Sequence, residues 1–349
     1  MTNKPLNDKT AFNVFDYVDI HLSSTKLAAH TAYGDINGLV SLREAICRYY
    51  QESFNYDLSP TRICITDGAS GALIIAIGLL VETGDEILLP ECCFPFYKIF
   101  SNLFGAQYRL LPLNENNCVD IEQLAKRVSV KTKAIIINSP SNPHGAVLST
   151  EELEFISSLE IPVIFDEVYQ SLSLNDTPIP SAISLSAQHF IVNSFSKSIA
   201  IAGFRLGYLI VPEKQIQFVT NAKANMNMCT SLPSQLLGEA LLKYWDYLVA
   251  NHRNMLINNW KIFNQAAAEF GLKLLSHPQA GFFTTIDISE TKQEPMTVAT
   301  NLAKHFAMST APSIDFQNSG SDFLRLNFAC PSEHIKPALQ RLSSYIKGV

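Results

Sequence analysis

Two cations lie in the segment 194–208, which reads SFSKSIAIAGFRLGY. A lysine in a dry pocket has a lowered pKa and becomes a nucleophile toward carbonyl groups, so Lys197 is a candidate for covalent chemistry. The forked donors of Arg205 suit a phosphate, and Ser194 and Ser196 supply hydroxyls close by in the sequence. The alternative is a surface turn, because most lysines are simply solvated. The segment therefore indicates an anion site beside a reactive amine, or an ordinary turn.

Two further polar candidates follow apolar runs. Asp166 ends the run VIFD, and a carboxylate at the end of a buried strand needs a cation or several hydrogen-bond donors nearby. Asn142 lies in NSPSNPHG directly before a proline, which favours an extended backbone and a fixed amide. The alternatives are a helix cap for Asp166 and a plain turn for Asn142. Taken one at a time, neither residue decides the function.

A small-residue turn and an aromatic side chain complete the set. The stretch GASG at 68–71 brings Ala69 and Ser70 to the start of a helix, where backbone N–H groups favour an anion. Phe94, in CFPFY, has a flat face that suits an aromatic ring. An ordinary strand–helix turn and a core phenylalanine are the alternatives. Together the candidates suit a phosphorylated, aromatic, nitrogen-containing aldehyde.

Alternating strands and helices must position these residues. Strands are expected at 62–66, 86–90, 133–138, 162–167, 189–195 and 205–211, and helices at 71–82, 120–128 and 150–160. This order predicts an α/β fold with a mainly parallel sheet between helices, and ligands bind such sheets beyond the carboxyl ends of the strands. Each candidate lies at the end of one of these strands or in the segment that follows it.

The pattern changes from about residue 235. A long helical stretch, roughly 235–268, leads to GFFTTIDI, a helix, FLRLNFA and a final helix, which predicts a smaller α+β domain. We expect an N-terminal arm at 1–30 that is part of the small domain, a large domain at 31–240 and a C-terminal small domain at 241–349.

The composition limits the class of partner. The net charge is −6, which argues against a nucleic-acid partner. The sequence contains no run of about 18 apolar residues, so it predicts no membrane span. The N-terminus lacks the apolar core of a signal peptide. The seven cysteines form no CxxC pair, so we expect a reduced cytoplasmic protein without a metal site.

The order of the motifs resembles that of the class I/II aminotransferases, which are pyridoxal 5′-phosphate (PLP) enzymes of fold type I. The resemblance runs from about Tyr33 to the C-terminus and is carried by YGDINGLVSLREAI, TDGASGAL, CFPFY, NSPSNPHG, FDEVY, SFSKSIAIAGFRLGY and FLRLNFA. It implies a transaminase that moves an amino group from an L-amino acid to a 2-oxo acid by a ping-pong mechanism.

The resemblance also implies a role for each residue. Lys197 would form the internal aldimine and then move a proton, and Asp166 would pair with the pyridinium nitrogen, which makes the ring an electron sink. Asn142 and Tyr169 would bind the ring 3′-oxygen, and Arg325 would hold the substrate α-carboxylate together with Asn142. The other cofactor contacts would be Phe94 on the ring, and Ala69, Ser70, Ser194, Ser196 and Arg205 on the phosphate. Tyr33 would reach the phosphate of the neighbouring subunit, which implies a homodimer with shared sites.

Two alternatives stay open at this point. The same motifs serve PLP-dependent lyases and decarboxylases, and a PLP-binding regulator without catalysis is a third reading. Two departures from the family pattern bear on substrate choice. His144 stands where NPTG has a hydroxyl residue, and the glycine-bearing loop that often precedes the Tyr33 region is not found. The sequence does not identify the amino donor or acceptor.

Overall fold

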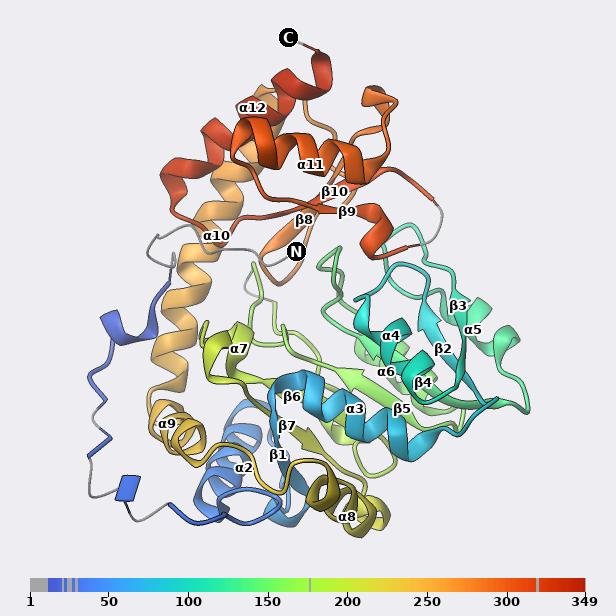
Figure 1. The fold of residues 1–349 in the computed structure, drawn as a ribbon, viewed down its shortest axis with the longest axis vertical. Helices are drawn as coiled ribbons and strands as arrows, with labels where there is room; N and C mark the ends of the chain where they lie inside the picture. Colours follow the sequence, from blue (N-terminus) through green and yellow to red (C-terminus); the bar gives the residue numbers. More distant parts are fainter. Residues whose placement is uncertain are drawn as a thin grey trace.

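The computed structural model describes residues 12–20, 22–23, 27–28, 31–175, 177–317 and 320–348. A seven-stranded sheet and a three-stranded sheet lie in two separate parts of the molecule, and the long helix α10 (Trp245–Glu269) runs beside both of them (Figure 1). The expected fold class is confirmed.

The large sheet has the strand order β1-β7-β6-β5-β4-β2-β3. Strand β7 pairs antiparallel with β1 and β6, and the remaining neighbours are parallel. The strand bounds are β1 Ile63–Asp67, β2 Glu86–Pro90, β3 Gln107–Leu111, β4 Thr132–Asn138, β5 Val163–Asp166, β6 Phe190–Ser194 and β7 Leu206–Ile210. Six of these correspond to the strands expected from the sequence, with ends that shift by at most one residue. Strand β3, with its partly exposed pattern, was not expected.

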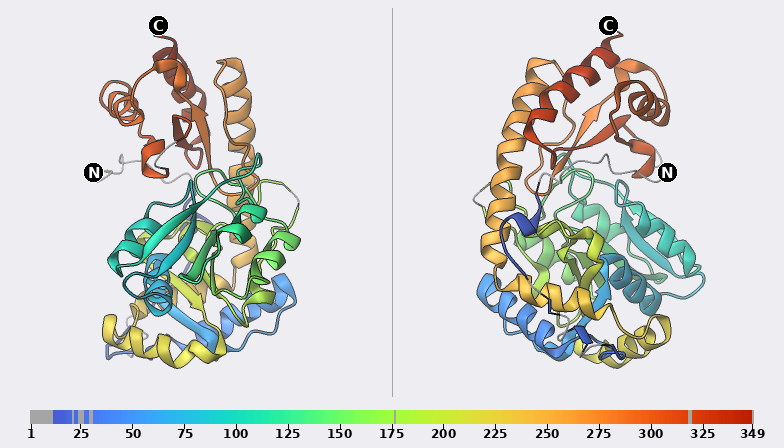
Figure 2. Two further views of the ribbon diagram at one scale, coloured as in Figure 1. Left: turned by 90° about the vertical axis from the view of Figure 1, so that its right-hand side faces the viewer. Right: turned by 60° about the vertical axis from the view of Figure 1, so that its left-hand side comes forward.

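Helices cover both faces of this sheet (Figure 2). Their bounds are α2 Val40–Phe54, α3 Gly68–Leu80, α4 Phe96–Leu103, α5 Ile121–Arg127, α6 Thr150–Ser157, α8 Ile216–Met226 and α9 Leu232–Leu242. In β4, Ile135 and Ile137 join one buried cluster and Ala134 and Ile136 join the other. Both faces of the strand are therefore buried, which explains why its sequence has no polar face.

The smaller sheet has the order β8-β10-β9, formed by β8 Phe283–Asp287, β9 Ala311–Pro312 and β10 Phe323–Asn327. Both strand pairs are antiparallel. Helices α10, α11 (Pro295–Phe306) and α12 (Ile335–Lys347) contribute to the core of this layer. The helical stretch expected at roughly 235–268 is two helices, because α9 ends at Leu242 and α10 begins at Trp245. Among the described residues, no helix is long and apolar enough to cross a membrane.

Candidate active site

A cavity opens at the carboxyl ends of the large-sheet strands, where the sequence predicts the ligand site. Its lining residues are Ala69, Ser70, Leu73, Phe94, Tyr97, Asn138, Asn142, Asp166, Val168, Tyr169, Ser194, Ser196, Lys197, Ala202 and Arg205. All the predicted cofactor contacts except Tyr33 are among them. The parallel strand order thus brings together residues from six short segments of the chain, at 69–73, 94–97, 138–142, 166–169, 194–197 and 202–205.

Lys197 lies in α7 (Phe195–Ser198), a single turn that directly follows β6. The side chain is half-buried and lines the cavity. Burial lowers the pKa of the Lys197 amine, and the positive charges of Arg325 and Arg205 lower it further. A larger share of this amine is therefore neutral, and so nucleophilic, than of a solvated lysine at the same pH.

Asp166 is buried at the end of β5 and has two hydrogen-bond donors. The Tyr97 hydroxyl donates to Oδ2 at 2.6 Å, and the Val168 backbone N–H donates to Oδ1 at 3.3 Å. Burial raises the pKa of the Asp166 carboxyl to about 6, while both donors and the nearby Lys197 lower it. The side chain thus does cap the residues that follow it, and it also faces the cavity.

The start of α3 and the Arg205 guanidinium lie side by side. Gly68 has φ +69°, and a Cβ there would come within 2.8 Å of the guanidinium. A Cβ at Gly207 would lie only 2.6 Å from the backbone carbonyl carbon of Gly68, so only glycine fits there. The Asp67 side chain does not cap α3 and instead accepts a hydrogen bond from Asn227. The first N–H groups of α3 and the guanidinium therefore form a cradle for an anion.

Arg325 projects from β10 toward the loop that follows β4. Its Nη1 donates to Asn142 Oδ1 at 2.8 Å, and the rings of Phe283 and Phe316 lie 5.1 and 5.0 Å from its Cζ. Its Nε is buried and has no hydrogen-bond partner. The neighbouring strand residues Leu324 and Leu326 are buried, whereas Arg325 is only partly buried. A guanidinium held between two rings suits a planar anion such as a carboxylate.

The remaining predicted residues differ in position. Phe94 and Tyr169 line the cavity, and the Tyr169 ring makes edge contacts with Phe282 and Phe283. Tyr33 is 77% exposed and does not line the cavity of its own chain. A role for Tyr33 therefore requires a second copy of the chain.

Comparison with known proteins identifies the family. Residues 23–342 match the family described as aminotransferase class I and II. This chain belongs to the class I and II aminotransferases. It is 30% identical to the (5-formylfuran-3-yl)methyl phosphate transaminase of Methanocaldococcus jannaschii, over 94% of this chain and 87% of that protein. It is 28% identical to the valine–pyruvate aminotransferase of Mycobacterium tuberculosis, over 88% and 82%.

Solved structures agree with that assignment. An aminotransferase from Mycobacterium tuberculosis superposes with a TM-score of 0.87 at 26% identity, over 93% of this chain and 87% of that one. An aromatic aminotransferase from Pyrococcus horikoshii superposes with a TM-score of 0.86 at 27% identity, over 92% and 89%. The protein is therefore a transaminase that uses amino acid and 2-oxo acid substrates, as the sequence predicts.

The aminotransferase site includes two residues for which the sequence suggested no role. Tyr97 is fully buried and donates to Asp166. Asn138 Nδ2 donates to the Asp166 backbone oxygen, and Asn138 Oδ1 accepts from the Asn142 N–H. Both residues lie inside the segments CFPFY and NSPSNPHG. The available signal was the position of Asn138 at the carboxyl end of β4 and of Tyr97 at the start of α4, which follows β2.

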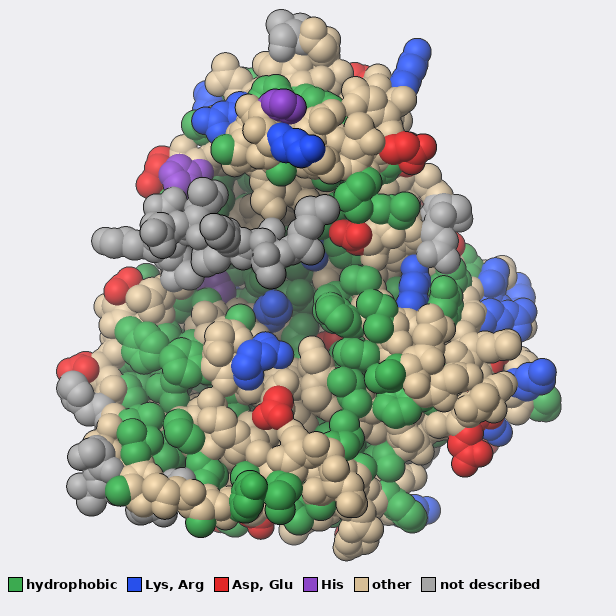
Figure 3. Space-filling model, in the orientation of Figure 1, with side chains coloured by type: hydrophobic (Ala, Val, Ile, Leu, Met, Phe, Trp, Pro, Cys, Tyr) green, Lys and Arg blue, Asp and Glu red, His purple; other side chains and the backbone are tan. Residues whose placement is uncertain are grey.

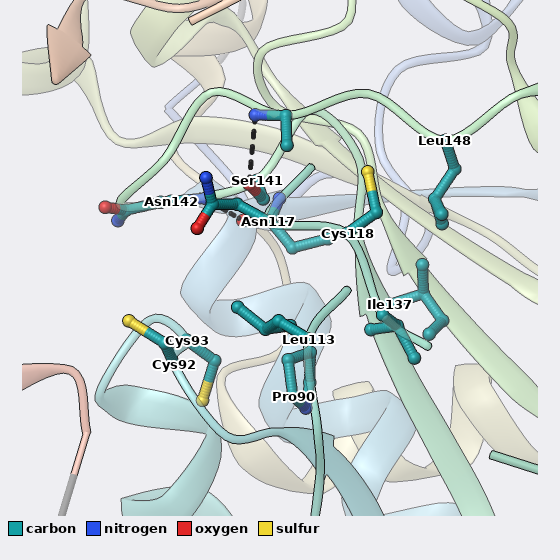
Figure 4. Close-up of a pocket in the computed structure, with 13 residues that line it drawn as sticks. Pro90, Cys92, Cys93, Leu113, Asn117, Cys118, Ile137, Ser141, Asn142 and Leu148 are labelled. Carbon is teal, nitrogen blue, oxygen red and sulfur yellow. Dashed lines mark hydrogen bonds between the residues drawn. The ribbon is translucent and has the colours of Figure 1, made fainter. Parts of the chain in front are cut away.

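A second, small pocket of the aminotransferase lies behind Asn142 (Figure 4). Asn138 and Asn142 line both pockets. The wall of the small pocket includes Cys92, Cys93 and Cys118, and burial raises the pKa of all three thiols. These thiols stay protonated at neutral pH, so on the cysteine side Asn142 shares this pocket with uncharged side chains only.

Proposed function

We propose that this aminotransferase holds PLP covalently through Lys197 and transfers an amino group between an L-amino acid and a 2-oxo acid by a ping-pong mechanism. The observation that supports the proposal most is the single cavity that joins Lys197, Asp166 and Arg205. An amine with a lowered pKa, a buried carboxylate and an anion cradle match the aldehyde, the ring nitrogen and the phosphate of PLP.

The absence of a Cβ at Gly68 and Gly207 supports the fit of the phosphate. A Cβ at Gly68 would strike the Arg205 guanidinium, and one at Gly207 would strike the backbone of Gly68 and Ala69, so either would displace a wall of the cradle. In our proposal Ser194, Ser196 and the hydroxyl of Ser70 join Arg205 there, with the Ala69 backbone close by. Phe94 would lie on the ring, and Asn142 and Tyr169 would bind the ring oxygen.

When bound, PLP accepts electrons from the substrate and so makes the Cα–H bond acidic. Asp166 keeps its charge opposite the ring nitrogen because Tyr97 and the Val168 N–H donate to it. Once the amino group of the substrate has replaced Lys197 on the cofactor, the free Nζ would take up the Cα proton and hold it as an ammonium group, a task that its lowered pKa favours near neutral pH. Arg325 binds the substrate α-carboxylate with the donors that Asn142 leaves free, and so orients Cα toward Lys197.

A homodimer is part of the proposal. Tyr33 is exposed, and several elements of the large-sheet region also expose large apolar side chains: Val40, Phe96, Phe204, Phe218, Met226 and Met228. Figure 3 shows hydrophobic side chains gathered on the face that carries α3, α4 and α8. An apolar surface of this kind marks an interface, and a second copy there would bring Tyr33 to its neighbour.

We also propose a reduced, cytoplasmic environment, which the seven free cysteines support. The division into an arm at 1–30, a large domain at 31–240 and a small domain at 241–349 stays a proposal. Phe12, Val14 and Val18 pack in the core of the large sheet.

A panel of L-amino acids added to PLP-loaded protein tests the function. We expect the visible absorbance of the bound cofactor to fall with a good donor and to return when a 2-oxo acid is added. Release of pyruvate and ammonia, or of CO2, without a 2-oxo acid would instead identify a lyase or a decarboxylase. An absorbance that no L-amino acid changes would contradict transamination.

A further inference from the structure

The buried face of α10 carries two polar side chains among apolar ones. His252, Leu256, Asn259 and Phe263 follow the helical spacing of that face and are all at most 2% exposed. Asn259 Nδ2 donates to the backbone oxygens of Phe328 and Cys330, which follow β10. Helix α10 is therefore bonded to the segment that directly follows the strand of Arg325, and its other polar side chain reaches a different part of the site.

His252 bonds the turn that carries Lys197. Its Nδ1 lies 2.9 Å from the backbone oxygen of Ser198, the residue after Lys197. A carbonyl oxygen only accepts, so Nδ1 carries the proton and donates. Ser198 is the last residue of α7, a single turn too short to hold its own geometry, and the carbonyl is buried. The imidazole thus provides the hydrogen bond that this helix end lacks.

The imidazole is covered by the N-terminal segment. The Phe12 ring stacks on His252 with centroids 4.5 Å apart and an interplanar angle of 17°. Phe12 stacks in turn on Tyr17 and is 2% exposed. Burial lowers the pKa of His252, which keeps the imidazole neutral. Because the ring is neutral and shielded from solvent, water does not compete for its hydrogen bond to Ser198.

We propose that His252 is a positioning residue for Lys197. It fixes the backbone oxygen of Ser198, and thereby the direction in which the Lys197 side chain leaves α7, with Phe12 holding the imidazole in place. The inference rests on the proposed function of Lys197 and adds to it a residue that does not touch the cavity. Neither the sequence pattern nor the resemblance assigns a role to His252.

The test compares His252→Leu, which removes the donor, with His252→Asn, whose amide nitrogen lies near the position of Nδ1. Two quantities are measured: the pH midpoint of the visible absorbance of bound PLP, and hydrogen exchange of the Ile199 amide, which bonds to Phe195 within α7. For His252→Leu we expect the midpoint to move by about 0.5 pH unit or more and the exchange to speed up about tenfold. His252→Asn should restore both quantities most of the way.

Asn259→Leu is the matched control, because it removes a buried donor from the same face of α10 without touching α7. It should leave the midpoint and the Ile199 exchange as they are in the unsubstituted protein. Equal changes in the Asn259 and His252 variants, or no change in His252→Leu, would overturn the inference. If His252→Leu does not fold, Phe12→Leu, which keeps the donor but loosens its cover, should speed up the same exchange by a smaller factor, and unchanged exchange would count against the inference.

The two proposals fail in different ways. If the unsubstituted protein takes up no PLP, the proposed function fails, while exchange of the Ile199 amide still tests whether His252 holds the turn. If PLP binds and the His252 variants behave like the unsubstituted protein, only the positioning role is wrong.

Discussion

The two ends of the site are built differently. The Asp166 end is built entirely from the large sheet and the segments packed against it. Its hydrogen-bond donors come from α4, from β4 and from the residues after β5. The Arg325 end spans both sheets, because an arginine of β10 meets Asn142 of the loop after β4. The same loop makes further bonds across the boundary, from Gln279 and Ala280 N–H to the Gly145 oxygen.

This difference separates two tasks. The Asp166 end holds its geometry whatever the smaller sheet does, which suits the permanent binding of a cofactor. The Arg325 end exists only while the two sheets are docked, which suits recognition of a substrate that enters and leaves. Substitutions at the first end should therefore change the cofactor, and substitutions at the second should change the apparent affinity for substrate.

Removal of the amine should have the largest effect. We expect Lys197→Ala to lower turnover by about 10⁴-fold, because in the proposed function the side chain serves both as attachment and as general base. Turnover is measured with the best donor of the panel. Circular dichroism and the thermal midpoint serve as the control, and both should stay near those of the unsubstituted protein. Unchanged turnover would show that another residue carries the chemistry.

Removal of the guanidinium should affect substrate rather than cofactor. We expect Arg325→Leu to raise KM for amino donors about 100-fold, because a charged, forked contact is lost. The amount of PLP that the protein binds should not change. Arg325→Lys keeps the charge without the fork and should fall in between. A loss of PLP in either variant would mean that the two ends are not independent.

Removal of the Tyr97 hydroxyl should weaken the cofactor end. Since its hydrogen bond lowers the pKa of Asp166, which lies at about 6, Tyr97→Phe raises that pKa and reduces the ionised fraction near neutral pH. We expect about tenfold weaker PLP binding at pH 7 and a smaller loss at pH 8.5. Equal losses at both pH values would point to packing rather than to the charge of Asp166.

The smallest effect concerns Glu167, next to Asp166 but facing away from the cavity. Its carboxylate accepts from Ser181 Oγ and the Ala182 N–H, and burial raises its pKa from 4.5 to about 7. The folded protein therefore binds more protons than the unfolded chain between these values, so this group costs stability as pH rises from 4.5 to 7.

Glu167→Gln removes that titration. Urea titration gives the free energy of unfolding of the unsubstituted protein and of the variant. The first value minus the second should fall as pH rises from 4.5 to 7. Burial lowers the pKa of His144 to about 4, which gives the opposite slope, but His144 is present in both proteins and cancels in the difference. A difference that does not depend on pH would show that Glu167 keeps its ordinary pKa.

Much of the site could be predicted because its residues follow strands that the sequence makes obvious. Lys197, Asp166 and Asn142 each stand at or shortly after the end of an apolar run. The β3 strand was missed because its exposed residues hide the apolar pattern. Tyr97 was missed because a buried tyrosine in an aromatic segment reads as core.

The sequence by itself determined the order of strands and helices, the residues at the strand ends and hence the family. Those features follow from local hydrophobic patterns and turn chemistry, which neighbouring residues carry. Only the tertiary structure decided that Tyr97 reaches Asp166, that Asn142 meets Arg325 and that His252 reaches Ser198. These contacts join residues far apart in the chain, and their geometry depends on how helices and sheets pack, which no local pattern records.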